Sequence, residues 1–596
     1  MDDAFDLIVI GTVRLDHVAW EDVLTSIWRG NTGWYGLAAA KTYIELHPSE
    51  HVAVLEANSS VGGVWAEDRL YPGLKSNNML GTYEYPDFPM TEATYGVKPG
   101  QHIPGTVLHR YLTDYAKASG VYQRIRFNTK VDSAMPSEDG GWLLKTSSSE
   151  IPSLQAKKLI VATGLTSQPY VPQLPGMQDF QGSLFHVREF AKHATTLNQA
   201  KHAVVVGGAK SGWDVAYAYA EAGVPVDMVI RKSGHGPVWM APPYVTPLKK
   251  WLEKLVHTRF LTWLSPCIWG DEDGYSGIRH FLHGTFIGRA IVNTFWKILA
   301  SDVIALNKYD SHPELQKLKP WEPAFYIGSS LSIHNYPTSF FDLVREGKIR
   351  VHIDEIAGFG AKSVRLASGE TIEADVTVLA TGWRKEPSLD FLGGLEADVG
   401  LHHSPSDLEA LTKDADAEIL QRFPRLKTQP ARKDQLEQTL TERTNQPLRL
   451  YRFMVPPAMV SRRNLAFAGM LSTITTSICA TVQGLWISAF LDGKLDRLPE
   501  SQDDLRWQTV LHSQFGRWRY PTGYGPSFPD FVFDAVPYVD MLLHDLNVES
   551  HRKSGGLADV FDPYGPQDYV GVLEEWKTGH TSTLTKTKTG TTGAAS

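Results

Sequence analysis

The sequence predicts an α/β fold with two Rossmann-like dinucleotide-binding domains. Two stretches support this prediction, because each has a run of apolar residues, then a glycine-rich turn, then the start of a helix. Strand-like and helix-like segments alternate after each turn, as in a parallel sheet with crossover helices. Each unit closes with an apolar strand that ends in Ala-Thr-Gly, at 162–164 and 380–382. The chain therefore carries an internal repeat of one nucleotide-binding unit.

The overall composition limits the class of protein. The chain has 596 residues, 42% hydrophobic and 21% charged, so we expect a globular protein of about two to four domains. Its net charge of −8 and lack of a basic block disfavour nucleic acid as a partner. Its two cysteines are too few for a disulfide framework, a cysteine-rich metal site or a paired-cysteine redox centre. No signal peptide is recognised, so the expected location is cytoplasmic, and no metal site is expected.

The first glycine-rich turn is interrupted. The strand predicted at 7–10 ends at Gly11, and the helix start follows only at Gly33. If the insertion 13–32 is removed, the remaining residues form a Gly-x-Gly-x-x-Gly turn with Gly11, Gly33 and Gly36. Two interpretations stay open: the insertion loops out as an exposed helix, or it is not part of the working protein, for example because a short intron was retained.

The second turn is uninterrupted. It follows the apolar run 203–206 and contains Gly207, Ala209, Ser211 and Gly212. In both units the turn would bring backbone N–H groups at a helix N-terminus close to a pyrophosphate, an anion that the helix dipole stabilises.

The end of the next strand differs between the units. The first unit has Glu56 there, whose carboxylate suits ribose hydroxyls. The second has Arg231 and Lys232, and two cations suit a ribose 2′-phosphate. The contrast predicts two different dinucleotides, of which only one is phosphorylated at the ribose. FAD and NADPH fit this pair of sites.

Two further motifs carry a family resemblance. Glu56 is followed after five residues by Gly62-Gly63-x-Trp65, and a second pattern lies between the two turns. Together they resemble FAD- and NADPH-dependent monooxygenases of the flavin-containing monooxygenase superfamily, in particular fungal enzymes of secondary metabolism. The resemblance covers roughly residues 5–235 and 370–495. The second pattern, the signature motif of this superfamily, consists here of Phe180, Gly182, His186 and Phe190.

The resemblance implies cofactors and a reaction. NADPH would reduce FAD, the reduced flavin would react with O2 to give a C4a-hydroperoxyflavin, and a small organic substrate would receive one oxygen atom. The implied FAD-binding residues are Gly11, Gly33, Gly36, Glu56, Gly63, Trp65 and Val131. The implied NADPH-binding residues are Gly207, Ala209, Ser211, Gly212, Arg231 and Lys232.

The subclass is predicted from residue identities that differ between related enzymes. In Baeyer–Villiger monooxygenases the signature motif ends in Trp followed by Pro or Asp, whereas here Phe190 is followed by Ala191. Asn77 stands ten residues before Asp87, as in the flavin-containing type, where Baeyer–Villiger enzymes have an Asp in place of the Asn. We therefore expect Asn77 as the catalytic amide near the flavin, with a capped turn at Asn77 and Asn78 as the structural alternative. A Baeyer–Villiger enzyme remains the alternative function, and a non-catalytic flavoprotein remnant is the alternative from another class.

The expected domain boundaries follow from these motifs. They are 1–175 for the first FAD-binding part, 176–200 for a linker with the signature motif, 201–382 for the NADPH-binding domain, 383–540 for the second FAD-binding part, and 541–596 for a C-terminal tail with a disordered end. A Trp-rich insertion at 236–330 could form a substrate pocket or lid, and its residues 260–304 could contact a membrane surface. Ser472, Thr473 and Thr475 could bond the edge of the flavin ring.

Overall fold

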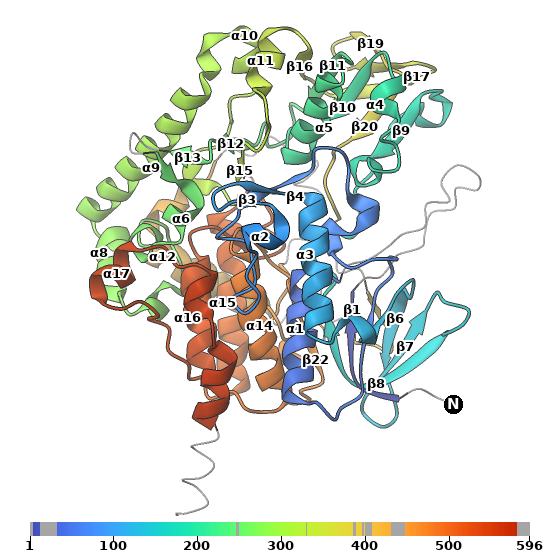
Figure 1. Ribbon diagram of the computed structural model, residues 1–596. Helices are drawn as coiled ribbons and strands as arrows, with labels where there is room; N and C mark the ends of the chain where they lie inside the picture. Colours follow the sequence, from blue (N-terminus) through green and yellow to red (C-terminus); the bar gives the residue numbers. More distant parts are fainter. Residues whose placement is uncertain are drawn as a thin grey trace, which may run out of the picture.

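The computed structural model describes residues 4–11, 32–245, 249–328, 331–384, 389–395, 399, 408–430 and 447–580. Except for Thr32, the insertion at 13–32 lies outside the described residues. Two separate sheets, each with a parallel nucleotide-binding core, confirm the predicted fold class (Figure 1).

The first sheet has eight strands and is built from both ends of the chain. Its order is β21-β6-β7-β8-β1-β2-β5, and β22 pairs with the end of β8 on the edge opposite to β1. The central strands β22, β8, β1, β2 and β5 are parallel, whereas β6 and β7 form an antiparallel extension. The bounds are β1 Ala4–Ile10, β2 Val52–Leu55, β5 Ile125–Arg126, β6 Val131–Pro136, β7 Trp142–Thr146, β8 Ser153–Val161, β21 Asp390–Phe391 and β22 Leu465–Phe467.

Two long helices, α1 (Trp34–Leu46) and α14 (Thr476–Leu491), pack directly against each other beside this sheet (Figure 1). Their backbones approach so closely that a Cβ on Gly484 would lie 3.0 Å from the carbonyl of Ala38. The third helix of this part, α3 (Gly105–Ala118), agrees within two residues with the helix that the apolar spacing predicts. The C-terminal helix α14 thus completes the unit that β1 and α1 begin.

The second sheet is entirely parallel, with order β16-β11-β10-β20-β9. Helix α5 (Lys210–Glu221) follows the glycine-rich turn at its centre. All residues of β10, β11 and β20 are buried, which explains their continuous apolar runs. The bounds are β9 Ser183–His186, β10 Ala203–Val206, β11 Val226–Ile230, β16 Ile349–Ile353 and β20 Val376–Leu379.

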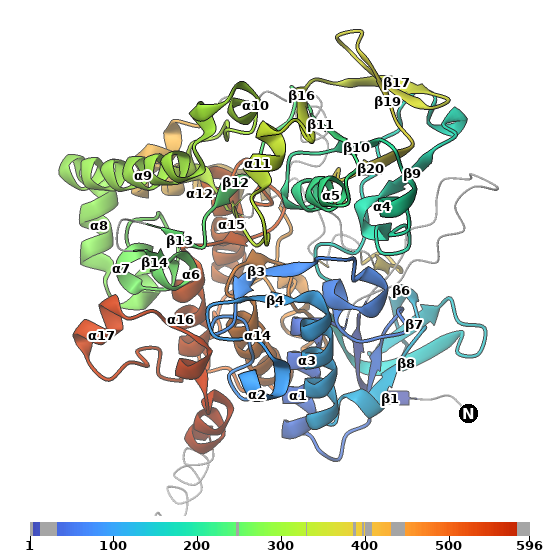
Figure 2. The same ribbon diagram turned by 45° about the horizontal axis from the view of Figure 1, so that its top comes forward.

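The Trp-rich insertion packs against the first unit. Trp239, Trp263 and Trp296 share one hydrophobic core with α1 and α14, not with the second sheet. Figure 2 shows helices α6 to α9 of the insertion beside the C-terminal helices. The elements of the insertion and its close are β12 Trp239–Ala241, β13 Tyr244–Val245, β14 Lys250–Trp251, α6 Leu252–Val256, α7 Arg259–Thr262, α8 Ser276–Gly284, α9 Phe286–Asn307, α10 Pro313–Gln316 and β15 Leu331–Ile333.

The C-terminal boundary differs from the expectation of a tail that begins at 541. Helix α16 (Ala535–Asp545) runs through that boundary, and Tyr569 and Trp576 are buried in the core. The guanidinium of Arg259 pairs with Asp540, with Nη2–Oδ1 at 3.1 Å and both side chains fully buried. Residues up to 580 are therefore part of the packed domain; those from 581 on lie outside the described residues.

The apolar runs of the sequence also predict a strand at 125–131 and two strands at 154–156 and 159–164, and both predictions were wrong in detail. The strand expected at 125–131 is split, because Asn128 adopts a left-handed φ of 53° and the chain turns from β5 into β6. The two strands expected at 154–156 and 159–164 are one continuous strand, β8. Its two lysines, Lys157 and Lys158, point their ammonium groups to Asp6 and to the Tyr43 hydroxyl.

Candidate functional site

The interrupted turn is assembled by residues on both sides of the insertion. Gly11 N–H donates to the carbonyl of Leu55 at 2.8 Å, and the backbone N–H of Thr32 donates to the carboxylate of Glu56. Gly62 N–H donates in turn to the carbonyl of Thr32 at 2.9 Å. Gly11 and Thr32 are thus hydrogen-bonded to Leu55 and Glu56, two consecutive residues at the end of β2. Gly33 follows Thr32 and is the N-cap of α1.

These contacts place Thr32 inside the turn and not in the insertion. Because Thr12 and Thr32 are the same residue type, removal of 12–31 leaves the same line of residues as removal of 13–32. The described residues therefore contain a complete Gly-x-Gly-x-x-Gly turn made of Gly11, Thr32, Gly33 and Gly36.

Glu56 lies at the centre of this turn with its side chain fully buried. Burial raises the pKa of the carboxyl to about 7, opposed by hydrogen bonds from the backbone N–H groups of Asn58 and Thr32. Both polar atoms of the Asn58 side chain are buried, and they have no hydrogen-bond partner among the described residues. A carboxylate and an amide held in this way match the two hydroxyls of a ribose.

The other predicted FAD residues lie around this point. A Cβ on Gly33 would lie 3.6 Å from Cα of Gly63, so the two glycines form a narrow passage between backbones. Trp65 is buried, and its indole N–H donates to the Tyr83 hydroxyl at 3.4 Å. Val131 is buried at the start of β6. The residues present fit FAD at this turn.

In the second glycine-rich turn the backbone segments approach each other more closely than in the first. Gly207 has φ +135°, and a Cβ there would lie 2.3 Å from the carbonyl oxygen of Ala380. A Cβ on Gly212 would lie 2.3 Å from the oxygen of Gly207, so only glycine allows this packing. Ala209 is the N-cap of α5, and Ser211 lies in its first turn. The backbone is shaped for a dinucleotide pyrophosphate at this helix N-terminus.

The two predicted 2′-phosphate ligands have different surroundings. Arg231 and Lys232 are both exposed directly after β11. The ammonium of Lys232 pairs with Asp354 at 3.2 Å, and Asp354 has its pKa lowered to about 2, first by its hydrogen bond with Ser368. The charge of Lys232 is thus partly compensated within the protein. Arg231 and Lys232 both stay the proposed ligands of a 2′-phosphate bound here.

The signature motif connects the linker to the second sheet through a hydrogen bond and packing contacts. His186 ends β9, and its Nε2 lies 3.0 Å from the carbonyl oxygen of Gly382. Burial lowers the pKa of His186 to about 4, so the ring is neutral near pH 7. Phe180 packs edge-on against Phe359 at 5.5 Å, and a Cβ on Gly182 would lie 2.5 Å from the carbonyl oxygen of Asp375. These motif residues position the domain junction.

Arg69 occupies the point where the two units meet. Its Nη2 lies 3.5 Å from the carbonyl oxygen of Thr166, beyond the end of β8, and its guanidinium lies 5.2 Å from the ring of Trp383, beyond the end of β20. Phe190 of the signature motif lies nearby, 5.2 Å from the ring of Tyr71. The carboxyl ends of the two parallel sheets, where nucleotides bind in such folds, are therefore brought together at Arg69.

Arg69 is buried and forms no ion pair with a carboxylate among the described residues, although Asp68 lies near enough to favour its charge. Its Nη1 is buried and makes no hydrogen bond within that part of the chain. Desolvation, with a smaller effect of Arg188, lowers its pKa to about 9. A buried cation of this kind fits the phosphate charge of a dinucleotide.

The predicted flavin-ring region is formed by β3 (Lys75–Met79) and the segment before α14. Asn77 is half-buried, and its side chain makes no hydrogen bond to another described residue. Neighbouring Asn78 donates from Nδ2 to the backbone carbonyl of Ile474 at 2.8 Å. Ser472 and Thr473 form β23, whereas Thr475 is buried.

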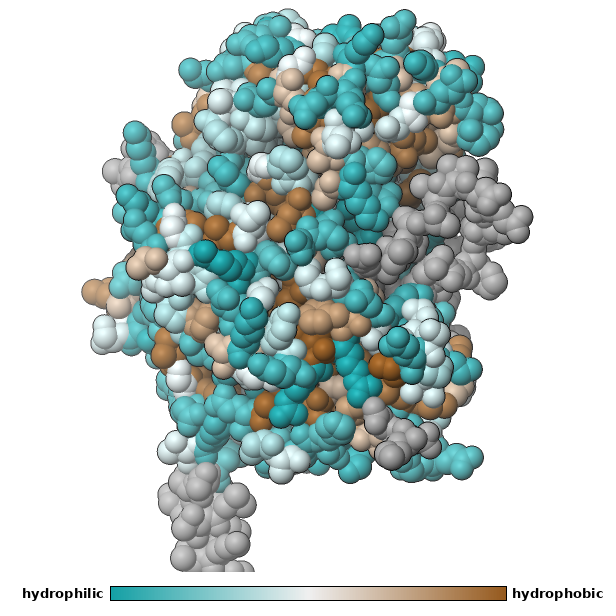
Figure 3. Space-filling view, turned by 45° about the vertical axis from the view of Figure 1, so that its right-hand side comes forward, coloured by the Kyte–Doolittle hydropathy of each residue, from teal (hydrophilic) through white to brown (hydrophobic). Residues whose placement is uncertain are grey.

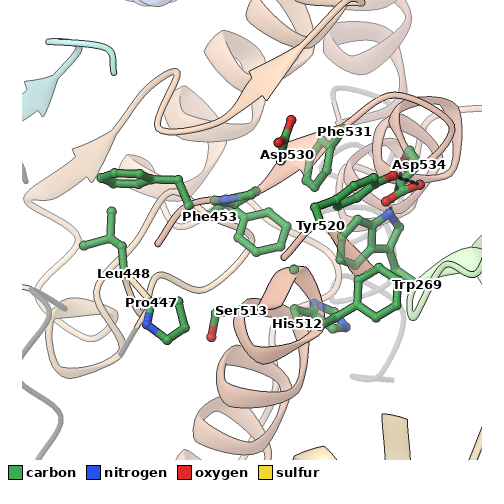
Figure 4. A pocket seen from close by; sticks show the side chains of 14 residues that line it. Trp269, Pro447, Leu448, Phe453, His512, Ser513, Tyr520, Asp530, Phe531 and Asp534 are labelled. Atoms are coloured by element: carbon green, nitrogen blue, oxygen red, sulfur yellow. Dashed lines mark hydrogen bonds between the residues drawn. The ribbon is translucent and has the colours of Figure 1, made fainter. Parts of the chain in front are cut away.

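A small cavity is lined by β24 (Asp530–Phe531), the strand that pairs with β23, together with Trp269, Phe453 and His512 (Figure 4). The water-accessible space is about 10 Å³, close to the volume that one water molecule needs. This cavity is too small for an organic substrate.

Several known proteins resemble this chain in sequence. A model of the pyridine nucleotide-disulphide oxidoreductase family matches residues 36–261. An FAD-dependent monooxygenase of Aspergillus nomiae is 33% identical over 91% of this chain and 96% of its own, and one of Pyrenophora dematioidea is 34% identical over 88% and 98%. The chain belongs to the FAD-dependent monooxygenases. This confirms the family resemblance drawn from the two motifs after the first turn.

A solved structure shows the same fold for this monooxygenase. Cyclohexanone monooxygenase from Rhodococcus sp. Phi1, bound to NADP+, aligns with a TM-score of 0.57 over 91% of this chain and 97% of that chain, at 16% identity. The two cysteines, Cys267 and Cys479, are both buried and free, so they do not supply the redox pair of a disulphide reductase.

Some site residues of the monooxygenase could not be found from sequence. The sequence alone assigns Thr32 to the insertion and gives Arg69 no role. Glu253, in the insertion, reaches Asn78 in the flavin-ring region. A single Glu within an apolar, Trp-rich segment carries no sequence signal for such a contact.

Proposed function

We propose that this chain uses NADPH and O2 to transfer one oxygen atom to a mid-sized organic substrate in secondary metabolism. The observation that carries the proposal is the junction at Arg69, where the carboxyl ends of both nucleotide-binding sheets meet. Two dinucleotides on these sheets would have their reactive rings within one enclosed region. The fungal relatives named FAD-dependent monooxygenases support the same reaction class.

The protein contributes positioning and exclusion of water. Bound FAD would supply the redox and oxygen chemistry. The first turn with Glu56 would hold FAD, and the second turn with Arg231 would hold NADPH. The insertion covers the flavin-ring region from one side, since α6 contacts β3 and the start of α14. Asn77, as the neutral amide beside the ring, stays the proposed catalytic residue.

We expect the purified protein to show the visible absorbance of bound flavin and to oxidise NADPH faster than NADH. Product analysis distinguishes the subclasses, because a Baeyer–Villiger enzyme converts ketones to esters or lactones, whereas the flavin-containing type oxygenates a heteroatom. Ester formation from a panel of ketones would favour the alternative. Protein that stays colourless after FAD is added would indicate a non-catalytic remnant.

Contact with a membrane surface is a second proposal, limited to the hairpin of α8 and α9. Figure 3 shows one face of the molecule on which hydrophobic residues are scattered among hydrophilic ones. By contrast, Phe286 and Ile287 at the tip of the hairpin are 81% and 64% exposed. Residues 274–301 include Arg289 and Lys297 but no Asp or Glu, although the chain as a whole is acidic. Exposed apolar side chains flanked by cations suit an anionic lipid surface. No described helix is long and apolar enough to cross a bilayer.

Replacement of both Phe286 and Ile287 by Ser is expected to abolish binding to vesicles that contain phosphatidylserine, as measured by co-sedimentation. The double variant should keep its flavin content, because both side chains point away from the core. As a control, Leu557→Ser removes a residue that is 79% exposed on α17 (Gly556–Phe561), outside the hairpin. Unchanged sedimentation of the double variant, or self-association of the wild type in place of lipid binding, would refute the proposal.

A further inference from the structure

Helix α6 of the insertion presents a buried carboxylate to the flavin-ring region. Glu253 is the second residue of this five-residue helix, and its side chain is 1% exposed. We propose that Glu253 is a positioning residue that fixes the amide of Asn78, so that the Asn78 carbonyl oxygen faces the space proposed for the flavin. This inference rests on the proposed function.

Four donors converge on the Glu253 carboxylate. Oε1 accepts from Nδ2 of Asn78 at 2.5 Å and from the hydroxyl of Thr82 at 3.0 Å. Oε2 accepts from the backbone N–H of Met79 and from the indole N–H of Trp251, both at 2.9 Å. None of these donors is charged, and no ion pair of Glu253 with a cation is found in the described part of the chain. A buried carboxylate without a cation is costly, so these contacts serve geometry more than stability.

The chemistry of the carboxylate determines the orientation of Asn78. Burial raises the pKa of Glu253 to about 7, so its ionised form predominates above that pH. In that form the carboxylate only accepts hydrogen bonds, and the backbone carbonyl of Ile474 also only accepts. Both N–H bonds of the Asn78 amide are therefore used, one toward Glu253 and one toward Ile474. The amide oxygen must point in the opposite direction. It makes no hydrogen bond to another described residue, so Asn78 offers an acceptor to an N–H or O–H group in the proposed flavin space.

The same helix end fixes the neighbouring position of the flavin-ring segment. His257 is 1% exposed, and its Nε2 lies 2.8 Å from the hydroxyl of Thr475. Burial lowers the pKa of His257 to about 4, so the ring is neutral. The chain from 253 to 257 thus contacts residue 475 directly and residue 474 through Asn78. The insertion is in this way a structural part of the proposed cofactor site.

The experiment uses the FAD-loaded full-length protein and the variants Glu253→Gln, Asn78→Ala and their combination. Glu253→Gln keeps the shape but places an N–H₂ group opposite one pair of donors, so the Asn78 amide loses its fixed orientation. We expect a changed visible spectrum of the bound flavin and an increase of about tenfold in the fraction of NADPH oxidation that ends in H2O2. Melting temperature should change little, and Glu253→Asp should recover part of the wild-type spectrum.

The double variant separates positioning from a general structural role. If Glu253 acts through Asn78, the combined variant should be no worse than Asn78→Ala alone. Additive effects, or a Glu253→Gln protein with a wild-type spectrum, would overturn the inference. Glu272→Gln is a matched control in the same insertion. The Glu272 side chain is 23% exposed and pairs with Arg497 at 3.0 Å and with His544 at 2.9 Å. Absence of flavin from the wild type would instead refute the proposed function.

Discussion

Deletion of residues 12–31 is expected to strengthen FAD binding by up to roughly 100-fold. The described contacts require Gly11 and Thr32 to lie against Leu55 and Glu56, two consecutive residues. Closing a chain of about 20 residues between such points costs roughly 2–3 kcal/mol by the (3/2)RT ln n relation. If the turn forms only with FAD bound, FAD binding must offset the closure cost, so binding is weaker by that amount. Removal of residues 12–31 removes the closure cost and strengthens FAD binding.

The measurement is the Kd of FAD for the deletion variant and for the full chain, from flavin fluorescence after removal of the cofactor. A variant in which 12–31 is replaced by a Gly/Ser linker of equal length is the control, because it keeps the closure cost without the native sequence. Weaker FAD binding by the deletion variant would mean that the segment contributes to the site. Sequencing of the mature transcript tests the retained-intron hypothesis, which is wrong if the segment is encoded there.

Replacement of Arg231 by Ala is expected to remove the preference for NADPH over NADH. A charge-assisted hydrogen bond to a phosphate contributes roughly 1.5–3 kcal/mol, so the Kd of NADPH should rise by about 10- to 150-fold. The Kd of NADH should change little, because NADH has no 2′-phosphate. Titration of both nucleotides, followed by flavin or tryptophan fluorescence, measures this difference.

Lys232→Ala is the matched control for this second prediction. Lys232 pairs with Asp354 at 3.2 Å, so the effect of its loss on NADPH binding, compared with that of Arg231→Ala, shows whether this ion pair limits its contribution. Equal effects of the two variants would show that the ion pair with Asp354 does not reduce the contribution of Lys232 to NADPH binding. A parallel rise in the Kd of NADH would show that Arg231 supports the turn and not the phosphate.

The local signals in the sequence were sufficient for the architecture. Buried parallel strands appear as continuous apolar runs, and a glycine-rich turn after such a strand has few structural alternatives. For the same reason the sites of Glu56 and Gly207 could be located along the chain. Val131 was assigned to a strand that the structure divides, because one left-handed residue, Asn128, cannot be recognised from composition.

Residues that act through distant contacts could not be predicted. Asn78 and Glu253 are 175 residues apart in the sequence, and Arg69 and Thr166 are 97 residues apart. Periodicity and motifs report on neighbours along the chain, whereas these pairs exist only because separate elements pack together. The tail expected from 541 is another case, because Asp540 is placed by Arg259, 281 residues earlier.

The sequence alone determined the two nucleotide-binding units, their order and the contrast between Glu56 and Arg231. These features depend on strand burial, turn geometry and charge type, which are properties of short segments. Only the tertiary structure decided that Thr32 completes the first turn, that Arg69 lies at the meeting point of both sheets, and that the insertion packs on the proposed flavin site. The physical reason is that burial and hydrogen-bond partners are set by elements far apart in the chain, and neither is written in the spacing of residues.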